Sequence, residues 1–197
     1  MFVGRERELA TLERLYRSDA FQMPVVYGRR RVGKTSLIVE FVKGKPAIFF
    51  SARESTAKEN LVALSQAIAD LRLDGTPVAS DTAAPVFASF EEAFTHVFML
   101  AQQQRIVFVI DEFPYLAQSD RSVSSVLQHL IDRRKENSRL FLILCGSSMS
   151  FMEHQVLGYK SPLYGRRTAQ IKVQPFDIMQ ASLLLSGSSS EDIDRKS

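Results

Sequence analysis

One short stretch constrains this chain more than any other part of its sequence. The residues GRRRVGKT run from Gly28 to Thr35 and match the pattern G-x-x-x-x-G-K-[ST] at every fixed position. An apolar run, residues 24–27, comes directly before it, and residues 34–41 predict a helix directly after it. Gly28 and Gly33 allow a tight turn, so that backbone N–H groups can surround an anion at a helix N-terminus. The stretch therefore predicts a strand, a phosphate-binding loop and a helix in succession.

The side chains of this phosphate loop, residues 28–35, suit a nucleotide. Lys34 is long enough to reach β- and γ-phosphates, and the hydroxyl of Thr35 is suited to bind magnesium. The predicted nucleotide contacts are Gly28, Arg31, Val32, Gly33, Lys34, Thr35 and Ser36. The three consecutive arginines at the variable positions either attract an anionic ligand as solvated charges or take a specific catalytic role. The alternative for the whole stretch is a basic turn between a strand and a helix.

Composition excludes several other classes of protein. The chain has 197 residues, of which 45% are apolar, as is typical of a folded globular domain. No apolar run approaches the roughly 18 residues of a membrane span, and the charged start MFVGRERELA does not resemble a secretion signal. A single cysteine, Cys145, cannot form an intrachain disulfide or a cysteine-rich zinc site, which favours the cytoplasm. The net charge of +3 is weak support for nucleic-acid binding.

A pair of carboxylates follows the most apolar run of the chain. Residues 106–110 are all apolar, and Asp111 and Glu112 come directly after them. A buried strand that ends in adjacent acids, in a chain with a phosphate loop, is typical of a Walker B motif. We expect Asp111 to hold magnesium and Glu112 to orient and deprotonate the attacking water as a general base. The alternative is that both acids merely begin a surface loop.

Predicted strands and helices alternate along the chain. Apolar runs predict strands at residues 24–27, 47–50, 106–110, 140–145 and 169–173. Helical spacing predicts helices at residues 5–16, 34–41, 56–71, 89–103, 122–134 and 149–156. Thr56 with Glu59, and Ser89 with Glu92, have the spacing of capping boxes, and residues 72–88 predict a loop. Alternation with uniformly apolar strands predicts a three-layer α/β domain, in which helices cover both faces of a parallel sheet.

Two further polar segments contain candidates for catalysis. The apolar run that ends at Cys145 leads into Ser147 and Ser148, either of which is placed to contact the γ-phosphate or the attacking water. The alternative for these serines is an N-cap of the helix that follows. Arg166, in a turn before the last predicted strand, is placed to face a nucleotide on a neighbouring subunit and to neutralise transition-state charge. The alternative for Arg166 is a solvated basic turn.

The motifs together resemble a known family. The run FVGREREL at residues 2–9 is similar to the N-terminal motif of AAA+ and STAND-type ATPases. Four later runs resemble motifs of the archaeal-type P-loop ATPase family and occur in the order that the family shows. They are YGRRRVGKTSL (27–37), IVFVIDEFPYL (106–116), LILCGSS (142–148) and PLYGRRT (162–168), the last followed by IKVQPFD. The resemblance covers nearly the whole chain.

This resemblance implies a fold, a nucleotide and a domain division. The implied fold is an AAA+-like P-loop NTPase of the ASCE group, with five parallel strands in the order 5-1-4-3-2. The implied nucleotide is ATP, with adenine contacts near Val3, Gly4 and Arg5. Because family members usually continue into a helical lid, we expect an ATPase core over residues 1–175. Residues 176–197 are then expected to begin an incomplete lid and to end in a partly disordered tail.

The sequence therefore predicts a magnesium-dependent ATPase that converts ATP to ADP and phosphate, with ATP and Mg²⁺ bound. One alternative is a nucleotide-dependent switch or scaffold with little turnover. Another is a DNA-associated module that uses basic clusters such as residues 133–135. An arginine that acts across a subunit boundary implies a homo-oligomer, and no membrane association is expected. The sequence does not identify an effector or a protein partner.

Overall fold

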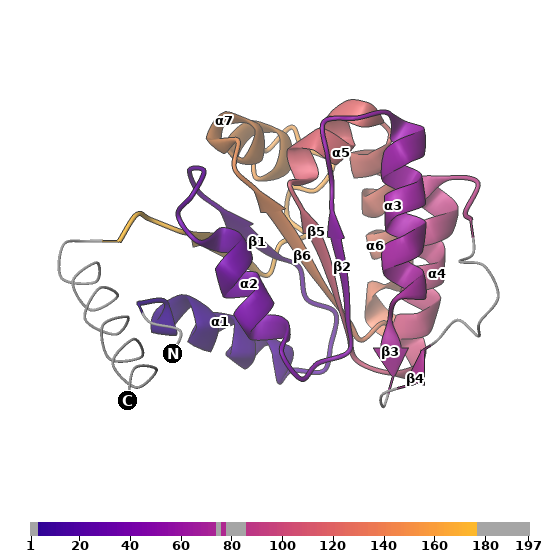
Figure 1. The fold of residues 1–197 in the computed structure, drawn as a ribbon, viewed down its shortest axis with the longest axis horizontal. Helices are drawn as coiled ribbons and strands as arrows, with labels where there is room; N and C mark the ends of the chain where they lie inside the picture. Colours follow the sequence, from indigo (N-terminus) through magenta and orange to yellow (C-terminus); the bar gives the residue numbers. More distant parts are fainter. Residues whose placement is uncertain (1–3, 74–75, 78–85, 177–197) are drawn as a thin grey trace, which may run out of the picture.

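The computed structural model describes residues 4–73, 76–77 and 86–176 (Figure 1). The strands are β1 (Pro24–Tyr27), β2 (Ala47–Ser51), β3 (Arg72–Leu73), β4 (Thr76–Pro77), β5 (Ile106–Asp111), β6 (Leu140–Gly146) and β7 (Ala169–Lys172). The α-helices are α1 (Glu6–Tyr16), α2 (Lys34–Val42), α3 (Ala57–Ala69), α4 (Phe90–Gln103), α5 (Phe113–Ser119), α6 (Val123–Arg134) and α7 (Met149–Phe151). A 3₁₀ turn, η1 (Lys135–Asn137), follows α6, and a π-helical turn, η2 (Met152–Val156), follows α7.

Five strands form one sheet in the order β2-β5-β6-β1-β7, and every pair in it is parallel. Numbered along the chain, these strands lie in the order 2-3-4-1-5, which is 5-1-4-3-2 from the opposite edge. The predicted P-loop NTPase sheet is therefore confirmed.

Alternate residues of the central strands enter two separate cores. In β5, Phe108 and Ile110 belong to one core, whereas Val107 and Val109 belong to the other. The first core includes residues of α3, α4 and α6, and the second includes residues of α1 and α2. Figure 1 shows these two groups of helices on opposite sides of the sheet. A strand covered on both faces needs apolar residues at every position, and this explains why β5 and β6 show no polar alternation.

The structure differs from the sequence predictions in the connections. The loop predicted at residues 72–88 contains a two-stranded antiparallel pair, β3 and β4, and α5 was not predicted at all. Each strand of that pair has two residues and α5 has seven, so neither is long enough to show a periodic pattern.

Parallel pairing brings the carboxyl ends of the central strands to one edge of the sheet. Ile110 of β5 lies opposite Leu144 of β6, and Tyr27 of β1 lies opposite Gly146 of β6. The residues that directly follow these strands must therefore lie near one another. Ligands of open parallel sheets bind at this edge.

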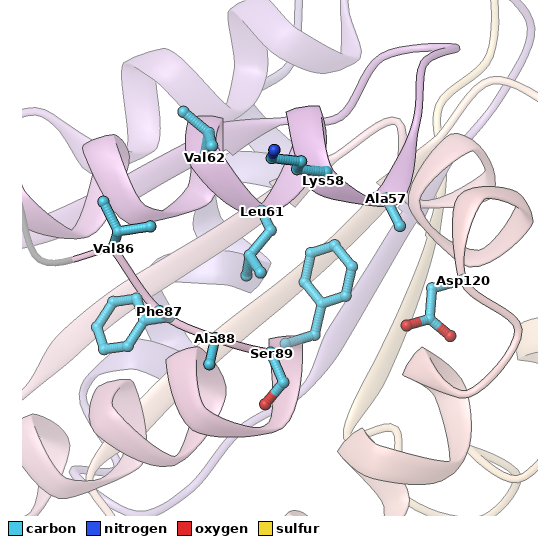
Figure 2. Close-up of a pocket in the computed structure, with 10 residues that line it drawn as sticks. Ala57, Lys58, Leu61, Val62, Val86, Phe87, Ala88, Ser89 and Asp120 are labelled. Carbon is cyan, nitrogen blue, oxygen red and sulfur yellow. The ribbon is translucent and has the colours of Figure 1, made fainter.

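A hollow of about 480 Å³ lies between the first turns of α3 and α4 and the end of α5 (Figure 2). Leu61 of α3 and Phe87, just before α4, contribute to its mainly apolar wall, and Asp120 lies on the far side. It shares no lining residue with the hollow at the phosphate loop, so the two are distinct. In the described ranges, no helix has the length and apolar character needed to cross a membrane.

Candidate nucleotide-binding site

The phosphate loop has the backbone that its sequence predicts. Gly33 has a φ of 87°, a left-handed conformation that glycine adopts without steric cost. A Cβ on Gly28 would lie 2.3 Å from the carbonyl oxygen of Val173, so only glycine fits beside the end of β7. Arg31 also has a positive φ, 64°, which for a residue with a side chain is uncommon and strained. Strain of this kind gathers at ligand-binding loops because the surrounding structure holds it in place.

The Lys34 side chain contacts the backbone of the phosphate loop. This side chain is buried, and Nζ donates hydrogen bonds to the carbonyl oxygens of Gly28 at 3.0 Å and Arg29 at 2.9 Å. A buried ammonium needs such partners because desolvation of an unpaired charge is costly. The same ammonium is the cation that phosphate oxygens would meet in this loop.

A hollow of about 490 Å³ opens over the loop. Its lining residues are Arg30, Arg31, Gly33, Lys34, Thr35, Ser36 and Glu112. Five of the predicted nucleotide contacts and the predicted base therefore face one space. Arg30 also donates a hydrogen bond to the hydroxyl of Tyr115 in α5.

Thr35 and Asp111 lie together, as a shared magnesium site requires. The Thr35 hydroxyl donates a hydrogen bond to Asp111 Oδ2 at 2.9 Å. A hydroxyl and a carboxylate are hard oxygen donors of the kind that Mg²⁺ prefers, so these residues fit that ion. Cys145 lies beside Asp111, and burial, reinforced by the negative charge of Asp111, raises the pKa of its thiol well above the usual value. The neutral thiol is therefore unsuited to bind a metal.

Glu112 is held in a specific orientation by the end of β6. Its Oε2 accepts hydrogen bonds from the Ser147 hydroxyl at 2.9 Å and from the Ser147 backbone N–H at 3.2 Å. The backbone of Glu112 is left-handed, with a φ of 51°, and its N–H donates to Asp111 Oδ1. The structure therefore brings Ser147 to the predicted base, a pairing that sequence spacing alone does not show. Ser148 occupies the N-cap position of α7 but makes no side-chain capping bond.

The adenine contacts predicted at the N-terminus are only partly within the described residues. Val3 lies outside them. Gly4 and Arg5 border a hollow of about 540 Å³ that also includes Gln174 and Pro175. Arg5 is buried, and its guanidinium donates to the backbone carbonyl of Val32 in the phosphate loop. The N-terminal motif is thus connected directly to the loop, and its contact with a base stays a prediction.

Arg166 is engaged within its own chain. Its guanidinium makes a two-pronged ion pair with Asp132 of α6 and also donates to the carbonyl oxygens of Pro162 and Tyr164. The hydrogen bonds from Arg166 lower the pKa of Asp132 below its usual value. To act on a neighbouring subunit, the guanidinium would have to leave these partners. The role of Arg166 as an arginine finger stays a prediction.

Comparison with known proteins shows what the chain is similar to. An uncharacterized protein of Methanocaldococcus jannaschii is 34% identical over 175 residues, which are 89% of this chain and 36% of that protein. The solved Walker-type ATPase of Pyrococcus abyssi has a TM-score of 0.73 at 25% identity, over 96% of this chain and 59% of that one. Cdc6p from Pyrobaculum aerophilum, at 16% identity, shares the fold with a TM-score of 0.62, over 94% of this chain and 49% of that one.

The chain thus spans about a third of the Methanocaldococcus protein and about three fifths of the Pyrococcus one. Residues 2–196 match the family described as an ATPase domain predominantly from Archaea. The match covers the phosphate loop, both acids and the end of β6, and it supports a nucleotide-binding ATPase function. By this match, together with the sheet order and the loop geometry, the chain belongs to the ATPase domain family found predominantly in Archaea.

Proposed function

We propose that this domain binds ATP with Mg²⁺ and hydrolyses it to ADP and phosphate. The observation that carries the proposal is the hydrogen bond between Thr35 and Asp111. Thr35 and Glu112, the residue after Asp111, line the same hollow. A phosphate loop alone binds nucleotide. A loop that also has an acid for the metal and a second acid for water has the groups that hydrolysis needs.

Each group has a separate task in this proposal. Lys34 would exchange its two carbonyl partners for phosphate oxygens, and the loop N–H groups would bind the same phosphates. Thr35 and Asp111 would hold Mg²⁺, which supplies positive charge that offsets the charge developing on the phosphates. Glu112 would take a proton from the attacking water, and Ser147 would keep its carboxylate oriented toward that water.

The first test is release of inorganic phosphate from ATP by the wild-type chain. We expect release in the presence of MgCl₂ and a fall to background when EDTA removes the cation, because the phosphate charge is then not neutralised. An unchanged rate in EDTA would contradict the assigned metal site. Calorimetry run beside this assay separates binding from turnover.

A nucleotide-dependent switch is the second candidate. It is favoured by the double hydrogen bond from Ser147 to Glu112, which would also restrain the base if it persisted with ATP bound. Tight ATP binding without phosphate release in MgCl₂ would support this candidate over hydrolysis. The predicted homo-oligomer and DNA association stay predictions.

Replacing Ser147 with alanine distinguishes positioning from restraint. A hydrogen bond to a charged group contributes about 1.5–3 kcal/mol, and about 1.4 kcal/mol corresponds to a tenfold change in rate. If the hydroxyl positions Glu112, kcat should fall about tenfold or more, while the Kd for ATP changes little.

Ser148→Ala is the matched control, because Ser148 is the exposed neighbour and makes no capping bond. Ser148→Ala should leave kcat and the Kd for ATP unchanged. A faster Ser147→Ala enzyme would mean that Ser147 restrains the base.

A further inference from the structure

Arg5 makes contacts that a residue of an adenine pocket does not need. Its side chain is buried although it carries a full charge, and Glu8 supplies the opposite charge at 3.2 Å. One nitrogen, Nη2, donates both to the carbonyl oxygen of Val32 at 2.9 Å and to the carbonyl oxygen of Gln174. A single guanidinium group therefore joins the phosphate loop to the chain that leaves β7.

We call Gln174, Pro175 and Phe176 the exit segment, since they carry the chain away from the sheet toward its C-terminus. The Phe176 ring lies against the Arg5 guanidinium, whose carbon is 4.2 Å from the ring centroid. It also lies against Gly4, where a Cβ would come within 2.8 Å of the ring. Gly4 and Arg5 thus hold the exit segment through the hydrogen bond from the Arg5 guanidinium to the Gln174 carbonyl and through their contacts with the Phe176 ring.

Phosphate binding is expected to disturb the contact between Arg5 and the phosphate loop. Lys34 donates to the carbonyl oxygens of Gly28 and Arg29, which belong to the same loop as Val32. When Lys34 turns to phosphate oxygens, those carbonyls lose their partner and the loop must adjust. The Val32 carbonyl is the point at which Arg5 contacts that loop.

We propose that Arg5 is a positioning residue that couples phosphate binding in the loop to the position of the exit segment. The inference rests on the proposed ATP binding and adds a consequence to it. Occupancy of the loop would shift the Val32 carbonyl, and Arg5 would transmit that shift to Gln174 and Phe176. Because coupling free energy is reciprocal, the position of the exit segment would in turn change the affinity of the loop.

The chain has no tryptophan, so Phe176→Trp introduces a single reporter into the exit segment. With this reporter, ATP should change the tryptophan emission. Adding Arg5→Met, which keeps an unbranched apolar stem but removes the guanidinium with its hydrogen bonds to Val32 and Gln174 and its ion pair with Glu8, should reduce that change to less than half. Adding Arg14→Met instead, at an exposed arginine of α1, the helix that follows Arg5, should leave the ATP-induced change intact.

A second variant and a second readout cover the case in which Arg5→Met does not fold or the tryptophan disturbs its site. Arg5→Lys keeps the charge but lacks the planar fork that joins two carbonyls and stacks on a ring. In a chain that retains Phe176, Arg5→Lys should weaken the ATP-induced change in amide hydrogen exchange at the exit segment. Calorimetry gives the Kd of this variant for ATP, so that the exchange at the exit segment is compared with the site occupied in both chains.

The outcomes separate this inference from the function on which it rests. An ATP response of the same size in the Arg5 variants and in Arg14→Met, with ATP bound in all of them, overturns the coupling alone. ATP binding with no response at the exit segment in the wild-type chain also overturns it. Absence of ATP binding by the wild-type chain overturns the proposed function, and the coupling fails with it.

Discussion

Glu112→Gln is expected to slow ATP hydrolysis by about 10²- to 10⁴-fold, the usual contribution of a general base. The amide has the shape of the carboxylate and can still accept the hydrogen bond from Ser147, but it cannot take a proton from water. ATP binding should change little, because the Thr35–Asp111 pair is left intact. Single-turnover hydrolysis and calorimetry measure the two quantities separately.

Glu91→Gln is the matched control for this substitution. Glu91 is an exposed acid in the first turn of α4, outside the lining of the phosphate-loop hollow, so its replacement should leave turnover unchanged. Wild-type turnover by Glu112→Gln would show that another group takes the proton and that the second acid of the pair has a structural task.

The second large effect is expected from Lys34→Met, which keeps the side-chain length and removes the charge. Phosphate oxygens would lose two or more charge-assisted hydrogen bonds, each of about 1.5–3 kcal/mol, so ATP binding should weaken by at least about a hundredfold. Calorimetry with ATP measures this loss.

Lys43→Met is its control, because Lys43 lies at the far end of α2 and pairs with Glu40 at the surface. That variant should bind ATP as the wild-type chain does. Equal affinity of Lys34→Met and wild type would contradict the assignment of the loop as the phosphate site.

The strands β1, β5 and β6 of the sheet were predictable because each is buried at every position and therefore apolar along its length. The predicted bounds of β1 match those of the structure, and those of β5 and β6 differ by one residue at the carboxyl end. The capping box of α3 is also confirmed, with Thr56 and Glu59 each bonding the backbone of the other. The box predicted before α4 is only half formed, because Glu92 accepts from the N–H of Ala88 instead of Ser89.

The site was predictable where a motif sets the spacing and not where a contact joins distant segments. The phosphate loop and the acid pair each lie within a few residues of sequence. The pairings of Ser147 with Glu112, Arg166 with Asp132 and Arg5 with Gln174 depend on sheet register and on side-chain direction. Sequence periodicity contains neither quantity, so candidate residues could be named but not their partners.

Cys145 gives the protein a practical property through its burial in β6. Maleimides react with the thiolate form of exposed cysteine, and this thiol is both enclosed and held neutral by its surroundings. A cysteine introduced at an exposed position, such as Val62 of α3, can therefore carry a fluorophore or spin label without removal of the native thiol. Slow modification of Cys145 itself would instead record the opening of the central strands, and so the local stability of the sheet beside the phosphate loop.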